Sequence, residues 1–244
     1  MRARPRFIIV EPDAAVSGEA AARKILEAFL PKAFRRPVPA TEVDRFFALF
    51  TAARTRRESF DEALLYSLEA VLMSPHFLFR REQPNPDPGP RLLSDYEIAA
   101  RLSYFLWGSI PDQTLTDLAA QGKLRDPATL KQQVSRLLLG GVERRDGDKV
   151  QIAPDGKLTE FATRFIEQWL GTRELGRDIR PDPALFPTYY DADLQAGIRY
   201  QPILFFQEVI TSNLSLLELI DSRFTFINIA LNRHYGLQMT NLRQ

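Results

Sequence analysis

LLSDYEIAARLSYFLW, residues 92–107, is the stretch of this sequence that most clearly predicts a helix. Ser94 and Glu97 have the spacing of a capping box, in which each side chain bonds the main-chain N–H of the other residue. Leu93 and Ile98 have the spacing of a hydrophobic staple, which fixes how the chain enters a helix. The stretch therefore predicts a helix that begins directly after Ser94.

The same predicted helix has two apolar faces. At about 100° per residue, two stripes lie almost opposite each other: Ile98, Leu102, Phe105 and Leu106 on one side, and Tyr96, Ala100, Ser103 and Trp107 on the other. A helix with two apolar faces packs against neighbours on both sides. We therefore expect an all-α fold, a multi-helix, bundle-like domain with at most a short strand or hairpin.

Other segments before residue 81 are also typical of helices. Residues 19–30 have helical character, and we expect Pro31 to bend or restart that helix. Thr41 is the predicted start of a second helix, and a second capping box at Ser59 predicts a third. Residues 7–10 are apolar and compatible with one short strand.

The segment 82–91 is rich in proline and predicts a stiff, extended connector between two helical subdomains, residues 1–81 and 92–244. In the second subdomain, we expect Pro202 to interrupt a helix. Residues 143–157 are charged and contain two Asp-Gly pairs. That segment is compatible with a surface hairpin or with a disordered excursion.

The composition excludes several kinds of site and partner. The 244 residues include 32 Lys and Arg against 31 Asp and Glu, so no net charge favours nucleic acid as a partner. Cysteine is absent, which excludes disulfides, thiolate metal sites and covalent c-type haem attachment in this chain. No apolar run approaches the ~18 residues of a membrane span, and residues 1–10 are too polar for a signal peptide. We expect no cofactor, no metal and no membrane span in this chain.

Few residues suggest chemistry. His76 and His234 lack a ligand-type partner one turn away, and both are typical of a histidine at the end of a helix, where His76 would bond a free carbonyl. Arg101 is expected to pair with Glu97 or with an acceptor on a neighbouring helix. Basic doublets such as Arg35-Arg36 are typical of solvated faces or buried helix ends. No nucleophile elbow, dinucleotide turn or P-loop occurs, although a glycosidase carboxylate pair stays open because such pairs are spatial.

Several blocks carry a family resemblance: residues 33–38, 74–80, 93–97, 101–107, 224–228 and 233–236. In this order they resemble planctomycete proteins of unknown function, DUF1595 followed by DUF1592. The resemblance implies a helical module in a periplasmic or extracytoplasmic protein that is linked to polysaccharide use. It also implies partners in other domains of a longer parent protein, among them a c-type cytochrome domain, which would hold any haem.

The leading functional hypothesis is a helical scaffold or docking module that is not an enzyme by itself. Two alternatives stay open: a carboxylate-dependent glycan hydrolase, and a binding module for glycans or haem proteins that uses exposed aromatic rings. We expect a functional surface to include some of seven residues: His76, Arg80, Asp95, Arg101, Trp107, Asn228 and His234.

Overall fold

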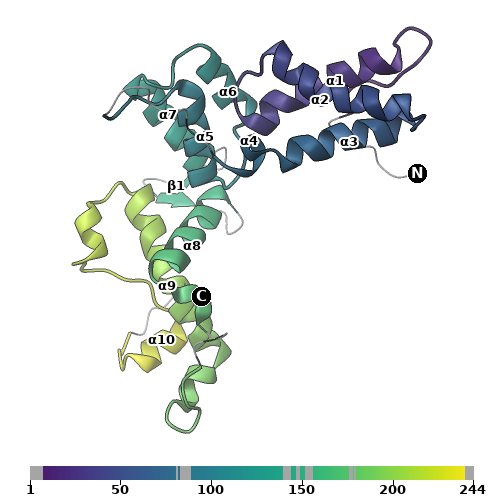
Figure 1. Cartoon of the computed structure of the whole chain (residues 1–244). Helices are drawn as coiled ribbons and strands as arrows, with labels where there is room; N and C mark the ends of the chain where they lie inside the picture. Colours follow the sequence, from purple (N-terminus) through teal and green to yellow (C-terminus); the bar gives the residue numbers. More distant parts are fainter. Residues whose placement is uncertain are drawn as a thin grey trace. The chain divides into compact units, whose positions relative to one another are not determined.

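The computed structural model describes residues 8–80, 82, 89–139, 144–146, 149–151, 156–175, 178 and 180–239. Within these residues the chain forms α-helices, short 3-10 helices and one two-stranded hairpin (Figure 1). The expected all-α fold is confirmed. The chain divides into two compact units, an N-terminal unit of residues 1–133 and a C-terminal unit of residues 134–244.

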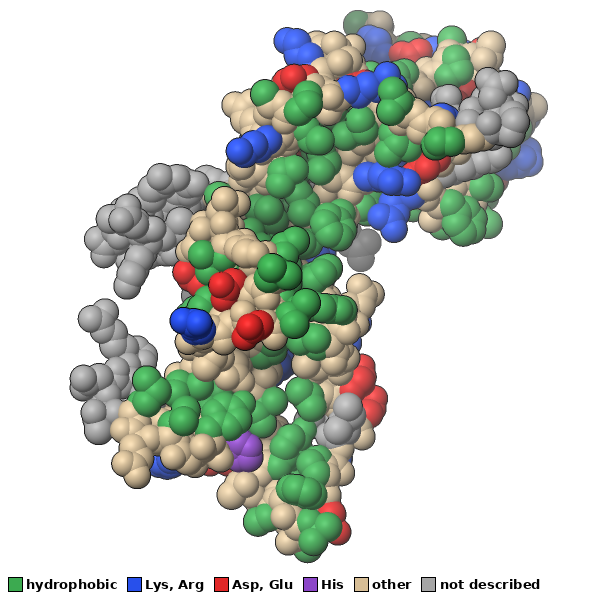
Figure 2. All heavy atoms as spheres, turned by 90° about the vertical axis from the view of Figure 1, so that its left-hand side faces the viewer, with side chains coloured by type: hydrophobic (Ala, Val, Ile, Leu, Met, Phe, Trp, Pro, Cys, Tyr) green, Lys and Arg blue, Asp and Glu red, His purple; other side chains and the backbone are tan. Residues whose placement is uncertain are grey.

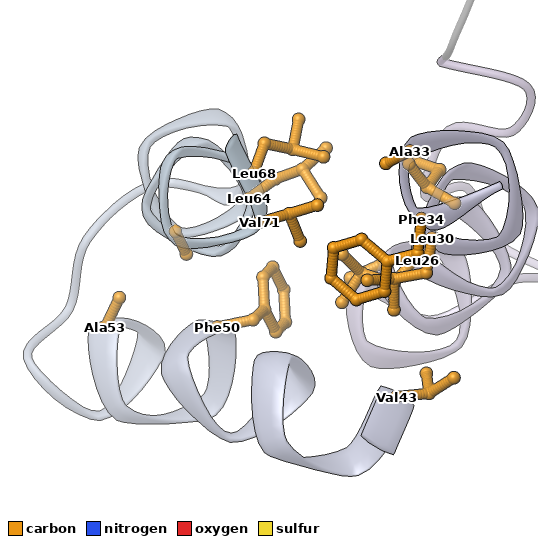
Figure 3. Close-up of a cluster of buried hydrophobic side chains, with 13 residues drawn as sticks. Leu26, Leu30, Ala33, Phe34, Val43, Phe50, Ala53, Leu64, Leu68 and Val71 are labelled. Atoms are coloured by element: carbon orange, nitrogen blue, oxygen red, sulfur yellow. The ribbon is translucent and has the colours of Figure 1, made fainter. Parts of the chain in front are cut away.

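The N-terminal unit is built on three helices, α1 (Gly18–Phe34), α2 (Ala40–Thr55) and α3 (Phe60–Met73). Their facing sides form an apolar core in which Leu26, Leu30, Phe50 and Val71 are fully buried (Figure 3). The short α4 (Pro75–Leu78) follows α3 directly. Residues 83–88 of the expected connector lie outside the described residues. Farther along the chain come α5 (Asp95–Leu106), α6 (Gln113–Ala120) and α7 (Pro127–Leu139), and the division between the units lies inside α7.

Three local expectations for this unit are wrong. Residues 8–10 form no strand, and instead Ile8 and Val10 pack against the helical core. Helix α1 does not restart at Pro31 but continues through it to Phe34, because burial of the helix on both sides of the proline outweighs one missing hydrogen bond. The alternative expectation, a bend at Pro31, stays a prediction. Helix α2 begins at Ala40 rather than after Thr41, without a side-chain cap. The capping box of α3 is present as expected.

Helix α5 begins where the sequence predicts, and its capping box is formed in both directions. Its expected double burial is only partly found: Leu106 is buried, Phe105 is 60% exposed and Trp107 is half-buried. The periodicity shows which residues share a face. It does not show whether a neighbouring helix covers that face, and α5 packs chiefly against α6.

In the C-terminal unit, α9 (Ala192–Thr211) packs against α8 (Lys157–Trp169) and α10 (Ile229–His234). Short 3-10 helices flank them: η1 (Thr172–Glu174), η2 (Pro187–Tyr190) and η3 (Leu216–Leu219). Strands β1 (Arg144–Asp146) and β2 (Lys149–Gln151) pair antiparallel, which agrees with the hairpin alternative for residues 143–157. Residues 143, 147–148 and 152–155 of that segment lie outside the described residues. Hydrophobic side chains are spread over this unit's surface (Figure 2). The side chain of Trp169 is 55% exposed.

Helix α9 does not stop at Pro202, contrary to expectation. Buried residues on both sides of the proline hold the helix against its neighbours, including Ile203 and Phe206. The Phe206 ring stacks on the Phe165 ring of α8 with centroids 4.9 Å apart. This packing offsets the roughly 3 kcal/mol that a proline costs inside a helix.

Candidate functional site

A cavity of about 640 Å³ lies in the N-terminal unit, where the end of α1, the α4 segment and the start of α5 come together. It is lined by Phe34, Arg35, Arg36, Pro37, His76, Arg80, Glu82, Ser94, Tyr96, Glu97, Ala100 and Arg101. We call this cavity the arginine pocket, because four arginines face two glutamates in its lining. It brings together His76, Arg80 and Arg101, three of the seven residues expected to be functional.

Arg35 holds the three segments of the pocket together. It follows α1 in the left-handed region, with φ +57°. Its guanidinium donates to the main-chain carbonyls of His76, Phe77 and Phe79 and to the Tyr104 hydroxyl, the last at 3.1 Å. All four acceptors are uncharged. The positive charge of Arg35 therefore has hydrogen-bond partners but no counter-ion among the described residues.

Arg36 is neutralised by a glutamate beside the pocket. Its guanidinium forms two parallel hydrogen bonds to the Glu42 carboxylate, both 2.9 Å long. These bonds, with the neighbouring positive charge, lower the pKa of Glu42 below its usual value. Since the Arg36 guanidinium is held by this fork, the pair serves as a fixed wall of the site.

His76 does not end a helix and bond a free carbonyl through its ring, as the sequence suggested. It is the second residue of α4, and its own carbonyl accepts from Arg35. Its ring lies beside the Phe34 ring, with centroids 5.3 Å apart, and its Nε2 is 3.8 Å from a carboxylate oxygen of Glu42. The difference arises because Pro75 starts a new turn directly after α3.

The carboxylates that line the pocket are both paired with arginine. The Arg101 Nε donates to Glu82 Oε1 at 2.7 Å. Of the two partners expected for Arg101, Glu97 is wrong, and the acceptor found lies outside the helices rather than on a neighbouring one. Glu97 instead turns back to the main-chain N–H of Ser94, at 2.7 Å, and to the guanidinium of Arg91. The capping box thus directs this carboxylate away from Arg101.

Two guanidinium groups share one aromatic ring at the pocket. The Arg35 Cζ lies 5.6 Å and the Arg80 Cζ 5.3 Å from the centre of the Tyr104 ring, within the range of cation–π attraction. Within the described part of the chain, no carboxylate pairs with either arginine. Arg35 and Arg80 are therefore two positive charges at the pocket without a counter-ion among the described residues.

A second cavity of about 700 Å³ adjoins the arginine pocket, with which it shares Arg35, Arg36, Pro37 and Tyr96. Trp107 lines this second cavity. Sequence reasoning singled out Trp107 for its place on an apolar stripe, and the structure puts it next to the site rather than in it.

The other three expected residues lie elsewhere. Asp95 accepts the main-chain N–H of Leu124 at 2.7 Å and so joins the start of α5 to the turn before α7. Asn228 and His234 belong to the C-terminal unit and are no part of the pocket. Asn228 caps α10 and donates to the Asp193 carbonyl at 2.8 Å, and His234 lies in the exposed last turn of α10.

Guanidinium groups are the most numerous polar groups of the pocket lining, and its carboxylates are paired. Among the described residues, no group of three His, Asp or Glu side chains is placed to hold a metal ion. No helix in the described ranges has the length and apolar character needed to cross a membrane. Both lining carboxylates accept hydrogen bonds from arginine, and Ser94 is engaged in a helix cap.

Comparison with known proteins places the two halves of the pocket in two family segments. No curated protein and no solved structure matches the chain. Residues 21–82 match the model described as PSD5: Protein of unknown function (DUF1595), and residues 93–237 match PSD4: Protein of unknown function (DUF1592). The pocket takes its lining up to Glu82 from the first match and the rest from the second. The chain therefore belongs to the DUF1592 family of proteins, with a DUF1595 segment before that domain.

Proposed function

We propose that this chain is a binding module that holds an anionic ligand in the arginine pocket and is not an enzyme by itself. The observation that carries the proposal is the pair of guanidinium groups, Arg35 and Arg80, beside the single ring of Tyr104 without a carboxylate partner among the described residues. Like charges held at one site raise the free energy of the empty pocket, and an anion lowers it.

The hydrogen bonds of the side chains that line the pocket support ligand recognition rather than catalysis. Arg35 and Arg36 are fixed by several hydrogen bonds, which keeps their charges in place before a ligand arrives. A glycoside hydrolase needs one carboxyl group that is free to donate a proton. Glu82 and Glu97 both accept hydrogen bonds from arginine, which leaves the hydrolase alternative without a suitable acid in this pocket.

The family resemblance suggests where such a module would act. We propose that it serves as a docking module within a longer extracytoplasmic protein, whose c-type cytochrome-like domain would hold haem. An acidic group on another domain, or on an acidic substrate brought to it, would then be the ligand of the arginine pocket. The expected absence of a cofactor from this chain is part of the same proposal.

The test is calorimetric titration of the whole chain with citrate and with inorganic phosphate at pH 7 and low salt, with glycerol as the uncharged control. Arg80→Gln removes one charge that has no carboxylate partner among the described residues and should weaken anion binding about ten- to hundredfold, since a hydrogen bond to a charged group contributes about 1.5 to 3 kcal/mol. Arg56→Gln is the matched control, because Arg56 also lies over a tyrosine ring, that of Tyr66, at 5.7 Å but outside the pocket. Absence of anion binding, or equal loss in both variants, would refute the proposal.

A further inference from the structure

We infer that the ligand of the arginine pocket is a carboxylate on an apolar body, and that Glu82 competes with it as an internal carboxylate. The inference rests on the proposed function and names the class of anion and the way its binding is regulated. Its starting point is that one carboxylate of the pocket lining, that of Glu82, is paired with an exposed arginine that a ligand can also reach. Glu82 Oε1 accepts a hydrogen bond from Nε of Arg101 and forms an ion pair with its Nη2.

The pair of Arg101 and Glu82 differs from the other ion pairs around the pocket in its exposure. The side chains of Arg101 and Glu82 are 63% and 40% exposed. In the pair of Arg36 and Glu42 the values are 29% and 15%. Exposed ion pairs contribute little to stability because water and salt screen them. Glu82 is therefore the carboxylate that an incoming anion can replace at small cost.

Replacement of Glu82 would give a ligand carboxylate two kinds of partner. Arg101 would offer the Nε and Nη2 groups that now hold Glu82. Arg80, which precedes Glu82 by two residues and has no hydrogen-bond partner in the described part of the chain, would add a second guanidinium in the same lining. A planar carboxylate fits the fork of an arginine with two parallel hydrogen bonds.

The rest of the lining favours a ligand whose carboxylate is attached to an apolar group. Phe34, Pro37, Tyr96 and Ala100 present apolar surface between the charged groups. A small, fully hydrated anion such as inorganic phosphate covers none of this surface, whereas an organic acid with an apolar ring buries it on binding. Benzoate is therefore the probe that matches the pocket, and benzyl alcohol is its uncharged counterpart.

The experiment titrates the full chain with benzoate, benzyl alcohol and inorganic phosphate by calorimetry. Glu82→Gln removes the internal competitor and should tighten benzoate binding about two- to fivefold, the range that corresponds to an exposed ion pair. Glu27→Gln is the control, because it removes a carboxylate from an exposed pair with Arg23 on α1, away from the pocket lining. Arg101→Gln should weaken benzoate binding and abolish the gain from Glu82→Gln in the double variant.

Each outcome bears on the inference. A gain for Glu82→Gln that depends on Arg101, with no such gain for Glu27→Gln, supports it. If benzoate binds but Glu82→Gln leaves its affinity unchanged or lower, the competitor role is overturned while anion binding stands. If phosphate binds as tightly as benzoate, the assignment to carboxylates is overturned. If none of the anions, citrate included, binds to the wild type or to Glu82→Gln, both this inference and the proposed function fail.

Discussion

Replacing Arg35 by alanine tests whether one side chain ties the end of α1 to the α4 segment and to α5. The guanidinium donates to three main-chain carbonyls and one phenol. A hydrogen bond from a charged group contributes about 1.5 to 3 kcal/mol. The carbonyl of Phe79 is on an exposed residue and regains water after the change. We therefore expect a loss of about 2 to 4 kcal/mol in the free energy of unfolding, equivalent to one or two fully effective bonds.

Arg57→Ala is the matched control for this change. Arg57 also follows a helix in the left-handed region, with φ +66° against +57° for Arg35. It is exposed and makes no side-chain hydrogen bond to any described residue. Both variants place alanine in the same kind of backbone position, so the difference between them isolates the side-chain bonds. Urea unfolding followed by circular dichroism gives both values. A difference below about 0.5 kcal/mol would show that the Arg35 bonds do not stabilise the unit.

Two further predictions concern the close contact of α9 with α10 and the pH dependence of stability. A Cβ on Gly197 would lie 2.8 Å from Cγ of Leu231, so Gly197→Ala should lower the free energy of unfolding by about 1 to 3 kcal/mol. Gly18→Ala is the control and should leave the free energy of unfolding unchanged, because the added Cβ would make only an ordinary contact at 3.6 Å. Equal melting temperatures for the two variants would contradict this reasoning. Glu42 has a lowered pKa in the folded state, so its contribution to stability is present above the ordinary value of 4.5 and is lost as the pH falls through the lowered one. Urea midpoints at pH 6 and pH 3.5 should therefore differ more for the wild type than for Glu42→Gln, and an equal difference would exclude Glu42 as a source of acid sensitivity.

The parts of the fold that were predictable from sequence are those with local causes. The capping boxes at Ser59 and Ser94 depend on residues within one turn of each other. The predicted restart of a helix at Pro31 and the predicted interruption at Pro202 were wrong because those predictions considered only local effects. Each proline removes one local hydrogen bond, but residues distant in sequence pack on the helix and outweigh that loss.

The candidate site was only partly predictable. His76, Arg80 and Arg101 were singled out one at a time, and nothing in their spacing showed that α1, α4 and α5 would bring them together. Arg35 was taken as half of a basic doublet. Its importance depends on a left-handed backbone at a non-glycine residue and on acceptors more than 40 positions away. Helical periodicity in the sequence predicts neither the backbone conformation of Arg35 nor its distant acceptors.

The pocket also gives a physical reason why the two family segments are adjacent in this chain. Arg35 comes from the DUF1595 match, and Tyr104, which accepts its hydrogen bond and lies under its charge, comes from the DUF1592 match. Both lie in the N-terminal unit, so the boundary between the family segments falls inside one compact body rather than between two. A segment that ended at Glu82 would keep the arginine charges of α1 and α4 but lose the ring beside them. The proposed binding site would therefore be a property of the two segments together, and selection for ligand binding would keep them adjacent in one chain.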